Sequence, residues 1–231
     1  MGCDVDNKAS TTTGFNSDQW TEVRFDIDPD VKPDIVSTML KMDGVPTASM
    51  DAIFSSHNIE HPYPHQAPVA LAEFTRVLKP NGFLVITCPD LQAMCQLVAE
   101  DKLLETAYLS PAGPVAPVAP VAPVDILYGL RTSMAAGNLF TAHCCGFTQK
   151  VFIGSIYHAG FAKVGASPRG SPYFDLWAVA AVDDQPAAQL QAVAAVHIPR
   201  CDSGHRGLHL ATLAPGSAVH PGVARITFYS R

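Results

Sequence analysis

The chain lacks a long apolar run and a strong charge of either sign. Hydrophobic residues make up 48% of its 231 residues, yet no uninterrupted stretch reaches the roughly 18 apolar residues that a membrane-spanning helix needs. The 15 basic residues are outnumbered by 21 acidic ones, so the formal net charge is -6 and no basic field attracts phosphate backbones. We therefore expect neither a membrane nor a nucleic-acid partner, and a small molecule or a protein fits better.

A disulfide framework is not expected either. Six cysteines are scattered along the chain without a regular spacing, and no charged-then-apolar leader precedes them. We therefore expect free thiols, as in a reducing compartment, and hence a cytoplasmic protein. Nothing in the composition predicts the oligomeric state.

No metal-binding spacing is recognised. Three histidines stand four residues apart, a spacing that would align their imidazoles on a helix: His57, His61 and His65. Two prolines interrupt that segment, so one helix presenting three ligands is not expected. Adding His143 and the two cysteines after it gives no known ligand pattern, and we predict no metal site.

The sequence does contain an alternation of short apolar runs with stretches of helical spacing between residues 20 and 90. The runs predict strands at 22–29, 34–38, 49–56 and 82–90. Between the last two, apolar residues recur at three- and four-residue steps and predict a helix that ends at a Pro-Asn-Gly stop. Strands joined by crossover helices are typical of a mostly parallel α/β sheet.

The second half of the chain continues this pattern. Helices are predicted over 91–105 and over 147–160, the latter beginning at a Thr148 cap. Strands at 161–164 and 174–180 then predict a closing antiparallel pair.

Two segments fall outside the pattern. A Pro-Val-Ala repeat lies within residues 111–125, and proline at every third residue predicts an extended, polyproline-like loop rather than helix or sheet. From residue 183 the pattern deteriorates into one alanine-rich helix, 186–196, and a tail rich in Gly, His and Pro. We therefore predict one domain over 1–182 and a poorly ordered extension over 183–231.

Two phrases carry a resemblance to a known family. A Ser-His-x-x-Glu-His phrase occupies 56–61, and Arg-Val-Leu-Lys-Pro-Asn-Gly-Phe at 76–83 joins a helix to the next strand. In this order and separation, the chain resembles the class I S-adenosylmethionine-dependent methyltransferases of the type 11 group. Segments 158–161 and 174–177 are similar to the family's closing hairpin. The resemblance implies a Rossmann-like sheet, S-adenosylmethionine as cofactor and a small-molecule or protein methyl acceptor.

The resemblance also implies a cofactor site. A carboxylate at the tip of a strand, here Asp26, can accept both hydroxyl hydrogens of a ribose, although Asp26 could also merely end a strand beside Pro29. Thr38 and Met39 stand where the family contacts adenine, but the usual acid is absent there. The implied cofactor-binding set comprises Gly2, Cys3, Asp26, Ile27, Thr38, Met39, Ser55, Ser56 and His57.

Methyl transfer depends mainly on positioning, and it needs a base only where the acceptor must lose a proton. His57 or His61 could serve as that base. The alternative is that His61 packs against the following helix and His57 only shapes the pocket.

The amino terminus departs from the family pattern. In the family a central strand precedes a glycine bend, whereas this chain begins at the bend with Gly2 and Cys3, and Asp4 replaces a glycine and would repel the cofactor's carboxylate. A missing central strand leaves buried backbone groups unpaired, each at a cost of about 1–3 kcal/mol. Segment 225–229 alternates as a strand with one wet face does, so we expect it not to fill the gap. A non-catalytic, methyltransferase-like binding protein is therefore the alternative function.

Overall fold

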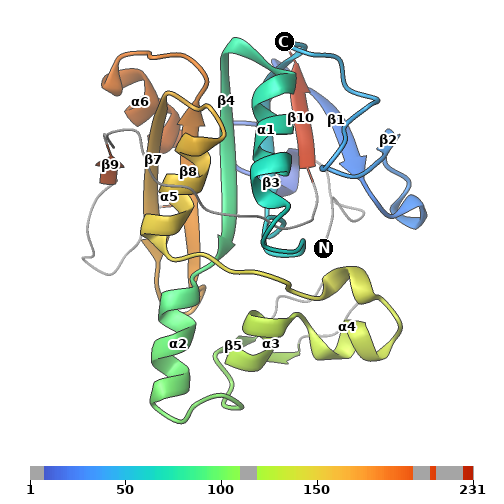
Figure 1. Cartoon of the computed structure of the whole chain (residues 1–231), viewed down its shortest axis with the longest axis vertical. Coiled ribbons are helices and arrows are strands. Elements are labelled where there is room, and N and C mark those ends of the chain that lie inside the picture. The colour runs from blue at the N-terminus through green and yellow to red at the C-terminus, as the bar shows by residue number, and fades with distance from the viewer. Residues whose placement is uncertain (1–7, 110–118, 200–208, 212–225, 231) are drawn as a thin grey trace.

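The computed structural model describes residues 8–109, 119–199, 209–211 and 226–230, and the statements below concern those residues. Their strands form an eight-stranded sheet in the order β2-β1-β10-β3-β4-β8-β7-β9 (Figure 1). The strand bounds are β1 (Thr21–Asp26), β2 (Ile35–Val36), β3 (Met50–Ser56), β4 (Leu78–Pro89), β7 (Lys163–Arg169), β8 (Asp175–Ala181), β9 (His209–Ala211) and β10 (Ile226–Ser230).

Strands β2, β1, β3, β4 and β7 run in one direction, and β10, β8 and β9 run in the other. The β7–β8 pair is the antiparallel hairpin that the sequence predicts. The predicted fold class, a mixed α/β sheet with mostly parallel strands and a closing antiparallel pair, is confirmed.

Helices cover both faces of the sheet because successive strand residues point to opposite sides. Ile53 packs in the core beneath α1 (Ala67–Val77) and α5 (Gln149–His158). Its neighbour Ala52 packs in a second core with Leu190 and Ala194 of α6 (Ala187–His197). The described residues also contain three short 3-10 helices: η1 (Lys8–Ser10), η2 (Pro29–Val31) and η3 (Leu139–Thr141).

A separate group of elements lies beyond the carboxyl end of β4 (Figure 1). It comprises α2 (Leu91–Ala99), β5 (Tyr108–Leu109), β6 (Pro120–Val121), α3 (Pro123–Tyr128) and α4 (Arg131–Ala135). A small core of Met94, Val121 and Ile126 holds α2, β6 and α3 together. No helix in the described ranges is long and apolar enough to cross a bilayer.

Local sequence explains where two of the helices begin. The Asp90 carboxylate accepts hydrogen bonds from the backbone N–H groups of Gln92 and Ala93 and caps α2. The Thr148 hydroxyl accepts one from Val151 and caps α5, so the predicted Thr148 cap is confirmed.

The end of the Pro-Val-Ala tract differs from the expected loop. Residues 110–118 lie outside the described residues, but β6 pairs with β5 and α3 begins at Pro123. Proline is compatible with the first helical turn because the N–H it lacks would have no partner there. The Asp125 carboxylate then accepts a hydrogen bond from the Ala122 N–H at 3.0 Å and stabilises this start.

The prediction that segment 225–229 leaves the centre of the sheet unfilled was wrong. Strand β10 lies between β1 and β3 and runs antiparallel to both, with Phe228 opposite Val23 on one side and Ile53 on the other. Phe228 and Tyr229 are both fully buried, one in each of the two cores. The aromatic pair gives the strand the two apolar faces that a central position requires.

Residues 183–231 are also not simply an appendage to a domain that ends at 182. Helix α6 covers one face of the sheet, β9 pairs with β7, and β10 lies at its centre. The alanine-rich sequence of α6 concealed this role because its few larger apolar residues, such as Leu190, suffice for packing against small strand residues. Residues 200–208 and 212–225 lie outside the described residues.

Truncating Phe228 tests the position of β10. Phe228→Ala removes a fully buried ring and should lower the free energy of unfolding by about 3–5 kcal/mol. Phe140→Ala is the matched control because Phe140 is 56% exposed, and its effect should stay within about 0.5 kcal/mol. Denaturant unfolding measures both, and equal effects would contradict the central placement.

His197 should make stability depend on pH. It is buried beside Phe15, with its Nδ1 2.5 Å from the Thr12 hydroxyl oxygen, and burial lowers its pKa to about 4 from 6.5. Between these values the unfolded chain binds a proton that the folded chain does not, so stability falls as the pH falls.

Relative to His197→Gln, the wild type should lose about 3 kcal/mol of unfolding free energy between pH 6.5 and pH 4. The exposed His158, changed to Gln, provides the control variant. Denaturant unfolding at a series of pH values gives both curves. A wild-type curve parallel to that of His197→Gln would refute the assignment.

Candidate functional site

The carboxyl ends of β1 and β3 lie at the same edge of the sheet. The register places Phe25 opposite Ile226 and Phe54 opposite Thr227, so Asp26 and Ser56 are level with each other across β10. Because neighbouring strands lie about 4.8 Å apart, the two ends are separated by about 10 Å. Two of the predicted cofactor-binding segments are thus brought to one edge, with one strand between them.

Asp26 ends β1 as a buried carboxylate. Its Oδ1 accepts a hydrogen bond from the Asp28 N–H at 2.9 Å, and its side chain is fully buried. Its backbone carbonyl accepts another from the Ser37 N–H at 2.8 Å, which joins this edge to the segment after β2. Ile27, the next predicted residue, is half-buried.

The predicted adenine contacts lie in a tight turn. The Thr38 hydroxyl accepts a hydrogen bond from the Leu40 N–H at 3.3 Å, and the Met39 side chain is fully buried in the core beneath α1 and α5. An adenine ring would meet Met39 only if this turn rearranged. Gly2 and Cys3 lie outside the described residues, as does Asp4.

The end of β3 is fixed to β4 by hydrogen bonds. Ser55 is buried, the Ser56 hydroxyl lies 3.1 Å from that of Thr87, and the His57 N–H donates to the Thr87 carbonyl at 3.1 Å. His57 has a φ of 50°, a left-handed conformation that few residues other than glycine adopt. The chain turns sharply there and directs residues 57–61 across the edge.

The His57 imidazole lies between two buried carboxylates. Its Nδ1 is 3.6 Å from Glu60 Oε1 and its Nε2 is 3.7 Å from Asp175 Oδ2. Burial acts to lower the pKa of His57, but the carboxylates of Asp175 and Glu60 outweigh it and raise the pKa to about 9. The side chain is 45% exposed, so water screens part of this field, but the upward direction follows from two acids facing one ring.

A charged imidazole cannot accept a proton. The role of His57 as a base therefore stays a prediction that requires the ring to be neutral when an acceptor is bound. As a cation, His57 would instead balance the charge of the two acids and hold negative groups nearby.

Asp175, at the start of β8, is held by an arginine of the adjoining strand. Arg169 donates to both carboxylate oxygens, from Nε at 2.9 Å and from Nη2 at 2.5 Å. Burial raises the pKa of Asp175, and the nearby charges of His57 and Arg169, together with the hydrogen bonds from Arg169, more than offset this and lower it. This carboxylate is therefore ionised at neutral pH.

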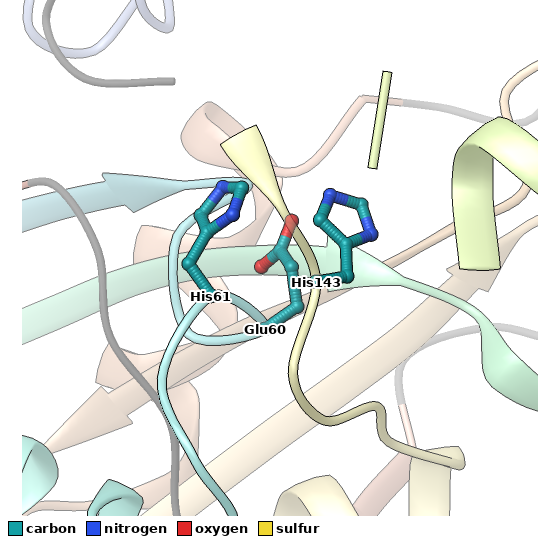
Figure 2. A group of neighbouring side chains, drawn as sticks. All are labelled: Glu60, His61 and His143. Carbon is teal, nitrogen blue, oxygen red and sulfur yellow. The ribbon is translucent and has the colours of Figure 1, made fainter. Parts of the chain in front are cut away.

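Glu60 and His61 form a second group with His143, which follows η3 (Figure 2). Figure 2 shows the Glu60 carboxylate between the two imidazole rings, whose centroids are 4.9 Å apart. His61 Nδ1 lies 2.9 Å from the Ala142 carbonyl oxygen, and its Nε2 lies 3.1 Å from that of His57. The predicted base His61 thus has both ring nitrogens next to backbone oxygens.

Burial affects the three side chains differently. It lowers the pKa of His61 to about 4 and lowers that of His143, so both rings are neutral near pH 7. Burial also acts to raise the pKa of Glu60, but the neighbouring histidines, His57 first, lower it to about 2. Because His61 and His143 are neutral, we attribute the lowering to the charge on His57.

Sequence reasoning missed two members of this neighbourhood. Asp175 lies in the phrase 174–177, but no spacing indicated that its carboxylate faces His57. His143 was considered only in a linear pattern with the cysteines that follow it, whereas the fold pairs it with Glu60 and His61. The adjacent residues Glu60 and His61 in the phrase 56–61 were the one sequence signal for this group.

A comparison with known families finds a match over the part of the chain that forms this edge. Residues 4–86 match a sequence model described as "Methyltransferase domain", a range that contains β1, β3 and the phrase 56–61. Residues 4–86 are therefore similar to that family. The predicted family is confirmed over that range, and the cofactor that this assignment implies is S-adenosylmethionine.

Several solved structures are similar to this methyltransferase-like chain at a low level. A protein from Pyrococcus horikoshii OT3 is 16% identical, with a TM-score of 0.40 over 68% of this chain and 71% of that one. A SAM-dependent methyltransferase from Methanosarcina mazei is 12% identical, with a TM-score of 0.38 over 64% and 66%.

A third similar structure is a SAM-dependent methyltransferase from Thermotoga maritima, described as a possible histamine N-methyltransferase. It is 12% identical, with a TM-score of 0.36 over 63% of this chain, and the match spans only 61% of that chain's length. A search among curated proteins finds no match.

The edge formed by β1 and β3 would fit S-adenosylmethionine in part. A carboxylate stands at the end of β1 and polar groups stand at the end of β3, which is the edge where open α/β sheets bind ligands. Asp26 is fully buried, however, so a ribose would reach its carboxylate only after a local rearrangement.

The Asp175–Arg169 pair can be tested by its contribution to stability. Asp175→Asn leaves the Arg169 guanidinium without a charged partner and should lower the free energy of unfolding by about 3 kcal/mol. Asp183→Asn changes an exposed acid and serves as control. If urea titration shows the two variants to be equally stable, the Arg169–Asp175 pair does not stabilise the β7–β8 hairpin.

Proposed function

We propose that the chain transfers a methyl group from S-adenosylmethionine to an acceptor bound beside the carboxyl edge of the sheet. The observation that carries the proposal is the level placement of Asp26 and Ser56 at one edge, within the range that matches the methyltransferase domain. When bound, the cofactor supplies an activated methyl group, so the protein mainly positions the two reactants.

Each segment of the edge has a separate task in this proposal. Asp26 would accept hydrogen bonds from the ribose hydroxyls. Thr38 and Met39 would adjoin the adenine, and Ser55, Ser56 and His57 would face the rest of the cofactor. Gly2 and Cys3 would supply the bend next to its methionine part.

The acceptor would be chosen by the elements beyond the edge. Helices α2, α3 and α4 lie below the carboxyl end of β4, on the side where the parallel strands end (Figure 1). This group is held to the segment after β3 by hydrogen bonds from the backbone of Cys144 and Cys145 to the Glu60 carbonyl, at 2.9 and 3.1 Å. A small molecule or a protein side chain would therefore reach the methyl group from this side.

The alternative is a methyltransferase-like protein that binds without catalysis. Two observations favour it: Asp26 is fully buried, and the strand beside it, β10, runs antiparallel to β1 and β3. An antiparallel strand cannot lead into a glycine bend at this edge as a parallel central strand does.

Binding of S-adenosylhomocysteine, measured by isothermal titration calorimetry, tests the proposal. We expect micromolar affinity in the wild type and at least about tenfold weaker binding in Asp26→Asn. The amide keeps an acceptor for the Asp28 N–H, but its NH₂ group cannot accept a ribose hydroxyl.

Asp30→Asn provides the matched control because Asp30 is an exposed acid four residues further along the chain. It should bind like the wild type. No heat from the wild type at high protein concentration would favour the non-catalytic alternative, and equal weakening by both variants would refute the role of Asp26.

A further inference from the structure

Glu60 is a buried carboxylate that lacks the usual partners. Its side chain is 1% exposed, and neither oxygen accepts a hydrogen bond from any residue that the structure describes. The charged neighbour, His57, is 3.6 Å away, which is too long for a hydrogen bond. Burying a carboxylate in this way costs free energy unless a cation or a proton balances it.

The side chains beside this carboxylate, His61 and His143, can act as metal ligands, and neither donates a hydrogen bond to it. The His143 Nδ1 is 2.8 Å from the Ile126 carbonyl oxygen, so that nitrogen carries the proton and Nε2 presents its lone pair. Such a backbone contact is the usual way in which a metal-binding histidine is oriented.

His61 is held in a comparable way. Its Nδ1 lies next to the Ala142 carbonyl oxygen and its Nε2 next to that of His57. Metal binding would exchange one of these two backbone contacts for a bond to the ion, while the other contact keeps the ring oriented.

These observations carry an inference that is independent of methyl transfer. We propose that Glu60, His61 and His143 bind one divalent ion of the first transition row, of the zinc type. One ligand atom from each residue lies within 4.8 Å of the other two, and two imidazoles with one carboxylate suit such ions better than calcium or magnesium.

The site is held together before any ion arrives. Cys144 and Cys145 donate from their backbone N–H groups to the Glu60 carbonyl, and the Cys145 thiol lies 3.3 Å from the Ile59 carbonyl oxygen. Ligand atoms in a tetrahedral site lie about 3.4 Å apart, so small side-chain rotations complete the coordination. Three protein ligands leave at least one position for water or a bound acceptor.

Cobalt titration of the full chain, after removal of metals with a chelator, tests the proposal. Co²⁺ bound by nitrogen and oxygen should give visible d–d bands at one equivalent, without an intense sulfur-to-cobalt charge-transfer band in the near ultraviolet. Zn²⁺ should displace it. Binding should weaken at least about tenfold in His143→Ala and in Glu60→Gln.

Two controls separate this site from other ligands. His65→Ala removes an exposed histidine close in sequence, and Cys144→Ser removes the exposed thiol next to His143. Both should bind Co²⁺ like the wild type. Binding that is absent in the wild type, lost in Cys144→Ser or unchanged in Glu60→Gln would overturn the proposal.

A thermal readout covers the case in which a variant folds poorly. Zn²⁺ should raise the melting temperature of the wild type and leave that of Glu60→Gln unchanged. The melting temperature of metal-free Glu60→Gln is the baseline against which the response of that variant to Zn²⁺ is compared. None of these measurements uses S-adenosylmethionine, so a failure of the metal proposal can be distinguished from a failure of the proposed function.

Discussion

The pairing of β10 with β1 and β3 is the interaction on which the rest of the structure depends. Among the described strands, β1 and β2 pair with the remainder of the sheet through β10, so this strand sets the register between Asp26 and Ser56. Phe228 and Tyr229 also link the two cores, one on each face. A single segment thus fixes both the continuity of the sheet and the geometry of the candidate cofactor edge.

The same strand imposes a chemical constraint on that edge. A parallel strand at this position would bring its carboxyl end and a following bend to the cofactor, whereas β10 brings its amino-terminal end. The polar groups available there come instead from β1, from β3 and from the loop of residues 57–61. The buried charges Glu60 and Asp175, with His57 between them, lie beside this edge and give it a strong local field.

Much of the architecture followed from the sequence because it rests on local signals. Apolar runs predicted β1, β3, β4 and β8, and the Thr148 cap predicted where α5 begins. The position of β10 could not be predicted in this way, because a strand far along the chain can pair anywhere and alternation alone suggested one wet face. Two adjacent aromatics, Phe228 and Tyr229, were the overlooked sign of burial on both faces.

The candidate site was predictable only where its members are neighbours in sequence. The phrase 56–61 contains His57, Glu60 and His61, and the family resemblance drew attention to it. Asp175 and His143 reach the same place through the hairpin and through the segment before α5, and neither spacing nor composition encodes those contacts. Long-range packing decides them, so they needed the structure.

The most direct test of the account is a set of nuclear Overhauser contacts across β10 in a labelled sample. The account predicts backbone contacts from Phe228 to both Ile53 and Val23, in the antiparallel register on each side. Direct backbone contacts between β1 and β3, or random-coil shifts for residues 226–230, would contradict it.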